Sequence, residues 1–132
     1  MERIPERARD LFERESFGHV SVVDPDGLPH VTPVWIDYDG EHVLFNTARG
    51  RRKERYVREN PNVGVSVLDP DDPYRYVSVR GQVVDVTEEG AVEHIDDLAR
   101  RYMDVDEYPH HGEEIGPRVI VWIRPDEVIT NG

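Results

Sequence analysis

Much of the chain alternates apolar and polar residues with a period of two, the pattern of a β-strand that buries one face. The first such run begins at His19, and turn-forming residues at 24–27 and 38–40 separate it from the next two. Short turns of this kind favour strands paired in sequence as hairpins. The pattern predicts six strands, at 19–23, 30–37, 42–47, 63–68, 75–86 and 118–124, the last of them closed by Pro125.

Three other segments carry features of helices. Residues 51–59 favour a helix because Glu54 and Arg58 can pair at a spacing of four, and Asn60-Pro61 ends it. Thr87 is placed to cap a longer helix over 88–103. Two apolar faces follow helical spacing: Ile4, Ala8, Leu11 and Phe12 beside 5–15, and Val92, Ile95, Leu98, Ala99 and Tyr102 within 88–103.

These elements predict one mainly β (α+β) domain spanning 1–132. Strands follow one another without a regular alternation of strand and helix, which indicates antiparallel pairing. Six strands with an apolar face leave fewer exposed edges when they close. We therefore expect a six-stranded antiparallel β-barrel with peripheral helices, and a polar loop over 104–116.

Composition excludes several classes of function. The chain has 28 acidic residues against 16 Lys and Arg, a formal charge of −12, so a general nucleic-acid binder is not expected. It has no Cys and no apolar run near the roughly 18 residues of a membrane span, so we expect a cytoplasmic protein without a membrane partner. The acidity is typical of a halophilic protein in a high-salt cytoplasm, where salt screens the repulsion between the acidic side chains. An ordinary acidic protein from a GC-rich genome is the alternative interpretation.

Basic residues gather in one segment. Residues 49–58 hold six basic residues against Glu54 alone, a net charge of +5 in an otherwise acidic chain. The segment joins a strand to a helix, where free amides, Gly50, Arg51 and Lys53 can together hold a phosphate. Cations are unfavourable at a helix N-terminus, which indicates an anionic ligand there. A solvated basic helix face is the alternative interpretation.

Three motifs resemble those of the split β-barrel family of flavin- and deazaflavin-binding proteins related to pyridoxamine 5′-phosphate oxidase. They lie at 29–35 (Pro-His-Val-Thr-Pro-Val-Trp), at 46–53 (Asn-Thr to Lys) and at Asn60-Pro61. The short chain and the form of the junction are most similar to the branch that uses the deazaflavin coenzyme F420. The C-terminal Arg and His substrate residues of the oxidases themselves are absent. The resemblance implies a homodimer with the cofactor in a groove between protomers.

The resemblance also implies roles for particular positions. Arg51 and Lys53 would hold the cofactor phosphate, and Asn46 and Thr47 the ribityl chain or ring edge. Backbone groups at 32–34 would face the ring. Arg52 and Arg55 are assigned to the oligoglutamate tail of F420 on charge alone, and Tyr74 and Tyr76 would complete the pocket from either protomer. The full set of expected cofactor-binding residues is Thr32, Pro33, Val34, Asn46, Thr47, Gly50, Arg51, Arg52, Lys53, Arg55, Tyr74 and Tyr76.

The expected function is an F420-dependent oxidoreductase that transfers a hydride between the reduced deazaflavin and a small organic acceptor such as an enone or quinone. An FMN-binding oxidoreductase, or a non-catalytic cofactor-binding or haem-related split-barrel protein, remains an alternative. No side chain has a motif that marks it as a general acid. His110 and His111 with Glu113 and Glu114 lack a recognised metal-ligand spacing, so a solvated loop is the preferred interpretation there.

Overall fold

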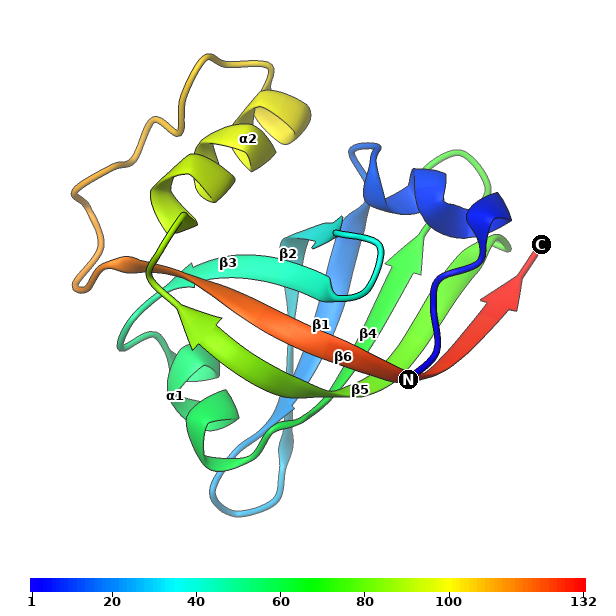
Figure 1. Cartoon of the computed structure of the whole chain (residues 1–132), viewed down its shortest axis with the longest axis horizontal. Helices are drawn as coiled ribbons and strands as arrows, with labels where there is room; N and C mark the ends of the chain where they lie inside the picture. The colour runs from blue at the N-terminus through cyan, green and yellow to red at the C-terminus, as the bar shows by residue number, and fades with distance from the viewer.

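The computed structural model describes all 132 residues, and its six strands close into the expected antiparallel barrel (Figure 1). The strands follow the order β1-β2-β3-β6-β5-β4 around the barrel. Each strand pairs with both of its neighbours in this order. Their bounds are β1 (Phe17–Val23), β2 (Pro29–Tyr38), β3 (Val43–Ala48), β4 (Asn62–Leu68), β5 (Tyr76–Thr87) and β6 (Arg118–Asn131).

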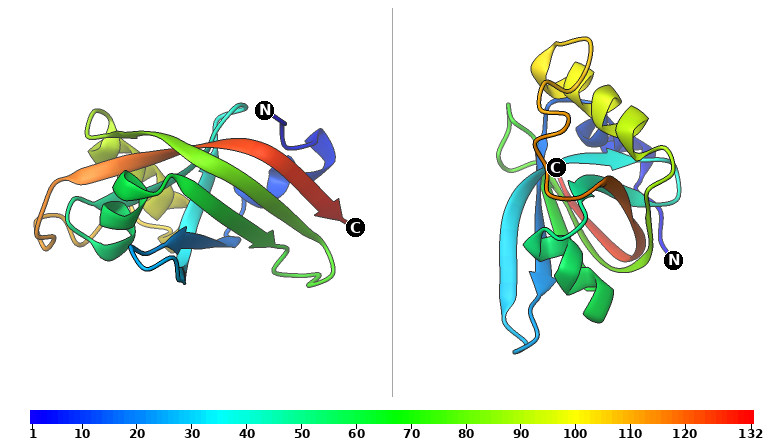
Figure 2. Two further views of the ribbon diagram at one scale, coloured as in Figure 1. Left: turned by 90° about the horizontal axis from the view of Figure 1, so that it is seen from below. Right: turned by 90° about the vertical axis from the view of Figure 1, so that its left-hand side faces the viewer.

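Three helices surround the barrel. A 3-10 helix, η1 (Glu6–Phe12), lies at one end of the barrel and α1 (Arg52–Glu59) at the other, as Figure 1 and the left-hand view of Figure 2 show. The longest, α2 (Ala91–Met103), packs over β2, β3 and β6. No helix of the chain combines the length and the apolarity needed to cross a membrane.

The apolar face predicted near the N-terminus is confirmed, but its helix is a 3-10 helix shorter than 5–15. All four residues of that face are buried. They belong to the same core cluster as the barrel interior, and so does Val57 of α1. Because the segment packs against β2, β4 and β5, one end of the barrel is filled by side chains of η1.

The prediction that Pro125 closes the last strand is wrong, because β6 continues to Asn131. Pro125 lies opposite Gly81, where the β5/β6 register shifts. A proline cannot donate to the ladder, and a bulge removes that requirement. Gly81 allows the close approach, since a Cβ there would lie 2.2 Å from the carbonyl oxygen of Arg124.

The predicted start of the long helix is also wrong. Thr87 is the last residue of β5, and its hydroxyl accepts a hydrogen bond from Trp122 Nε1 at 2.8 Å. The helix begins at Ala91 after Gly90, whose φ of 76° is left-handed and favours glycine. This later start leaves Val92 54% exposed, outside the apolar face on which it was expected, while Ala91 is buried.

The barrel is split between β2 and β3. Only three residue pairs join these strands, from Ile36 to Tyr38 on β2, whereas β1 and β2 are joined by seven. Residues 29–35 of β2 therefore pair with β1 alone, and their other edge is open. This open edge of β2 faces the region where a ligand pocket is found.

Candidate functional site

A cavity of about 310 Å³ lies at the split between β2 and β3. It is bounded by α2, the start of α1, the start of β6 and the loop 104–117 that joins α2 to β6. The volume is at the small end of the range of ligand pockets. Its lining residues are Phe17, Pro33, Val34, Trp35, Asn46, Thr47, Arg51, Lys53, Ile95, Leu98, Met103, Tyr108, His110 and Arg118.

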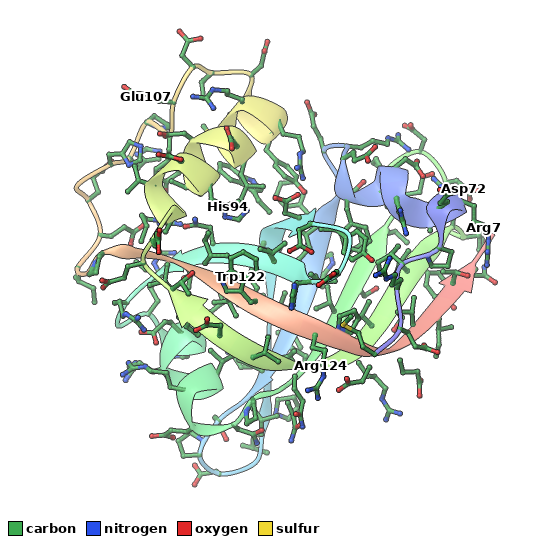
Figure 3. All side chains as sticks on the ribbon, viewed as in Figure 1. Arg7, Asp72, His94, Glu107, Trp122 and Arg124 are labelled. Atoms are coloured by element: carbon green, nitrogen blue, oxygen red, sulfur yellow. The ribbon has the colours of Figure 1, made fainter.

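Half of the twelve residues predicted to bind the cofactor line this cavity: Pro33, Val34, Asn46, Thr47, Arg51 and Lys53. The remaining six do not. Thr32 and Gly50 lie next to lining residues, and Arg52 and Arg55 are exposed on α1. Tyr74 and Tyr76 lie elsewhere, since the Tyr74 amide donates to Asp72, which Figure 3 places at the far end of the barrel from α2. Within one chain these tyrosines cannot reach the cavity.

Three cations meet at one end of the cavity, and we call Arg51, Lys53 and Arg118 the cation cluster. Arg118 was not predicted as a site residue, and only the β3/β6 pairing brings it beside Asn46. Burial lowers the pKa of Lys53, the Arg51 and Arg118 charges lower it further, and Glu114 opposes them. Burial likewise lowers the pKa of Arg118. The cations are therefore held close together in a partly desolvated place.

The local sequence explains why α1 presents its N-terminus at the cation cluster. Gly50, at a φ of 91°, turns the chain, and its amide donates to Oε1 of Glu54 at 2.8 Å. Glu54 is buried and also pairs with Arg58, as the sequence predicted. The amides of 52–54, in the first turn, form no hydrogen bond within the chain. A helix N-terminus with free amides beside three cations is suited to an anion.

Two further groups at the site have no partner within the chain. The Thr47 hydroxyl is buried without a hydrogen bond, and the Lys53 ammonium forms no ion pair within 4.0 Å. Such groups normally have partners when they are removed from water. A ligand that carries both a phosphate and hydrogen-bonding groups would supply them, so these residues fit a phosphorylated cofactor.

Aromatic side chains form one wall of the cavity. The Trp35 ring is stacked on Tyr102 with centroids 5.3 Å apart, and Tyr108 meets Trp35 edge-on at 6.1 Å. The Arg118 guanidinium lies over the Tyr108 ring, 5.3 Å from its centroid. Trp35 lines the cavity together with Phe17. The wall is suited to a flat, largely apolar ring system.

A partly buried polar network lies beside the cavity. Asn46 Nδ2 donates to the Ala91 carbonyl at 2.8 Å, while its Oδ1 accepts from Arg118 Nε at 2.8 Å, which fixes the orientation of the amide. Nδ2 also faces His94 Nδ1 at 3.2 Å, so that ring nitrogen is the acceptor and Nε2 donates to Asp37 at 3.1 Å. His94 lies between α2 and the sheet (Figure 3).

The network was missed in the sequence because Asp37 and His94 are 57 positions apart. The only sign of the network in the sequence is a polar residue beside an apolar one on each element: Asp37 follows Ile36, and His94 precedes Ile95. Arg101 completes it, donating to Asp37 Oδ1 at 2.9 Å and to the Ile36 carbonyl at 2.8 Å. Because every donor of Asn46 is engaged, its amide positions Arg118 more than it offers free groups to a ligand.

Replacing Asp37 with asparagine is expected to lower the free energy of unfolding at pH 7 by about 2–3 kcal/mol, because Arg101 would lose its partly buried anionic partner. Burial acts to raise the pKa of Asp37, but the hydrogen bonds from His94 and Arg101 outweigh it and hold the pKa below its usual value. The stabilisation is thus complete above about pH 4 and is lost as the pH falls through the lowered value.

Urea denaturation at pH 7 and at pH 3 measures this effect. The wild type is expected to lose more stability on acidification than Asp37→Asn does. Asp97→Asn is the matched control, since Asp97 is 71% exposed and pairs only with Arg100 on the same helix. If Asp37→Asn and Asp97→Asn lowered the free energy of unfolding at pH 7 by the same amount, the role given to Asp37 would be contradicted.

The two loop histidines have separate partners. His110 pairs with Glu113 inside the loop, and His111 pairs with Asp96 on α2 at 2.7 Å. Ligand atoms of Asp96, Glu107 and His111 lie within 4.8 Å of one another, a set that differs from the one considered in the sequence. Glu107 lies on the outer side of the loop in Figure 3. These contacts, and a hydrogen bond from the Tyr108 amide to Asp96 at 2.8 Å, fasten the polar loop to α2.

Fold and site together define a small split-barrel protein with a cavity beside a cluster of cations, and comparison with known proteins assigns the family. The family model described as "Pyridoxamine 5′-phosphate oxidase" matches residues 4–132. The chain belongs to this family, as the resemblance in the sequence had indicated. Among proteins with curated descriptions, no significant match was found.

Solved structures agree with the family assignment. A protein described as an F420 reductase is 37% identical, with 96% of this chain and 98% of that chain covered and a TM-score of 0.83. The conserved hypothetical protein Rv2991 from Mycobacterium tuberculosis is 24% identical over 97% of this chain and 84% of its own, with a TM-score of 0.76. HupZ from Group A Streptococcus is 17% identical over 96% and 93%, with a TM-score of 0.70. The last two show the fold alone.

Proposed function

We propose that the chain is an F420-dependent oxidoreductase that reduces a small organic acceptor. The observation that carries this proposal is the cavity itself, which has an aromatic wall at one side and the cation cluster with free helix amides at one end. A tricyclic deazaflavin ring and its phosphate have matching chemistry. The 37% identity to an F420 reductase supports the choice of cofactor.

In this proposal the chain's own residues bind the cofactor, orient it and exclude water from the cavity. Arg51, Lys53 and the first-turn amides of α1 hold the phosphate, and the Thr47 hydroxyl bonds to the ligand chain. When bound, the reduced cofactor supplies a hydride to the acceptor. Tyr108 and His110 line the cavity and carry exchangeable protons, so they are available to protonate the reduced acceptor.

The open edge of β2 contributes backbone groups. A proline in a paired strand must face away from its partner, so Pro33 faces the open edge, and alternation places the Trp35 amide on the same side. The Pro33 carbonyl and the Trp35 N–H are then an acceptor and a donor for the edge of a pyrimidine ring. These two groups would bind the edge of the ring and orient it for transfer.

A homodimer would complete the pocket. Exposed apolar side chains lie on the outer face of the barrel: Phe17 at the cavity, and Val31, Leu68 and Ile129 farther from it. Between them the β1–β4–β5 register places His19, Ser66 and Ser78 in one row, and the two serines allow a second protomer to approach closely. A partner on this face could bring Tyr74 and Tyr76, which one chain alone keeps far away, to the cavity.

Parallel calorimetric titrations with F420 and with FMN, in high salt, test this function, followed by assay of reduced F420 against a panel of quinones and enones. Tight binding of F420 with turnover is expected. A preference for FMN would move the function to flavin oxidoreduction at the same site, and binding without turnover would indicate a cofactor carrier. Binding of neither would contradict the assignment.

A further inference from the structure

Glu114 lies within the cation cluster. Its carboxylate accepts hydrogen bonds from Arg51, by Nε at 3.0 Å and Nη2 at 2.7 Å, and from Nη1 of Arg118 at 3.0 Å. The Glu114 side chain is only 11% exposed, although Ile115, next in the loop, is 87% exposed. Bidentate contact with one guanidinium and a bridge to a second is also how proteins hold a phosphate.

We propose that Glu114 is an internal anion, which competes with the phosphate of an incoming ligand for Arg51 and Arg118 and is displaced when that phosphate binds. This rests on the phosphate-binding role proposed above for the cation cluster. Glu114 occupies the Nε–Nη2 fork of Arg51. A phosphate that uses the same fork cannot share it with the carboxylate, because two anions in contact repel each other.

The exchange would make Glu114 a determinant of specificity. The cation cluster and the Glu114 carboxylate together have a net charge of +2. A ligand carboxylate only replaces one single charge by another, whereas a terminal phosphate such as that of FMN, with a charge near −2, adds a further attraction. Lys53, which has no ion pair, is free to make the first contact. Glu114 thus favours phosphate and discriminates against simple carboxylates.

Displacement of Glu114 would also release part of the loop. Towards its end the loop is fastened by His111 to Asp96 and by the Arg49 amide to the Pro117 carbonyl at 2.9 Å. Between these points, the ion pairs of Glu114 are the only side-chain bonds that join the loop to the rest of the chain. Ligand binding should therefore loosen residues 112–116.

Two variants of the whole chain test this exchange. Glu114→Gln removes the competing charge, and Glu113→Gln is the matched control, because Glu113 pairs only with His110 and changes the net charge equally. With pyrophosphate as the probe, titration calorimetry is expected to show about tenfold tighter binding to Glu114→Gln than to Glu113→Gln. Acetate is expected to show no comparable gain.

Hydrogen exchange gives a second readout that does not depend on activity. Amides of 112–116 are expected to exchange faster in Glu114→Gln than in Glu113→Gln, and faster in the wild type when pyrophosphate is added. Unchanged or weaker pyrophosphate binding by Glu114→Gln, no pyrophosphate binding by any variant, or slower loop exchange on binding would overturn the proposal. If pyrophosphate distinguishes the variants while neither F420 nor FMN binds, the exchange stands and the proposed function falls.

Discussion

Replacement of Lys53 by alanine is expected to weaken the binding of F420 and FMN by about 10- to 150-fold, the loss of one charge-assisted hydrogen bond worth roughly 1.5–3 kcal/mol. The ammonium lines the cavity and forms no ion pair within the chain, so the substitution removes a ligand contact without breaking an internal one. The stability of the protein is expected to change little, because relief of the repulsion from Arg51 and Arg118 offsets the lost packing.

Titration calorimetry of Lys53→Ala beside Arg100→Ala separates a local contact from an effect of net charge. Both variants lose one positive charge, but Arg100 is an exposed residue of α2 paired with Asp97. Arg100→Ala is expected to bind both cofactors as the wild type does. Dissociation constants that match in the two variants would remove Lys53 from the phosphate site.

Replacement of Gly81 by alanine is expected to lower the free energy of unfolding by about 3 kcal/mol or more, among the largest effects of single substitutions. The added Cβ would lie 2.2 Å from the Arg124 carbonyl oxygen and 3.2 Å from a methyl group of Ile123. Neither atom can move without disturbing the β5/β6 pairing around Pro125. Both strands belong to the closed barrel, so the strain cannot be confined to an edge.

Gly64→Ala is the control for this prediction. Gly64 lies on β4, and the nearest atoms to an added Cβ are 3.9 Å away, an ordinary contact. That variant is expected to stay within about 0.5 kcal/mol of the wild type. Midpoints of urea unfolding measure both, and a Gly81→Ala variant as stable as Gly64→Ala would show that the bulge can relax.

The sequence predicted the barrel well because its information was local. A period of two located all six strands, and short turns implied their antiparallel pairing. The errors arose where tertiary contacts override a local rule. Pro125 reads as the end of a strand unless the bulge opposite Gly81 is known, and Thr87 reads as a helix cap unless its bond to Trp122 is known.

The candidate site was predicted only in part, for a related reason. Motifs near the strand-to-helix junction named Asn46, Thr47, Arg51 and Lys53, which do meet at the cavity. Arg118 and Glu114 reach the same place from a distant strand and a polar loop, where no local pattern marks them. Charge alone assigned Arg52 and Arg55 to the oligoglutamate tail; both are exposed on α1 outside the cavity, and the assignment stays a prediction.

The open edge of β2 has a consequence for the behaviour of the chain in concentrated solution. An unpaired strand edge invites a strand from another molecule to add to it, which begins aggregation. On β2 the residues that face the open side include Pro29 and Pro33, and neither has an N–H to donate. A foreign strand would therefore lose two of its hydrogen bonds, so the edge is accessible to a small ligand while it resists uncontrolled growth of the sheet.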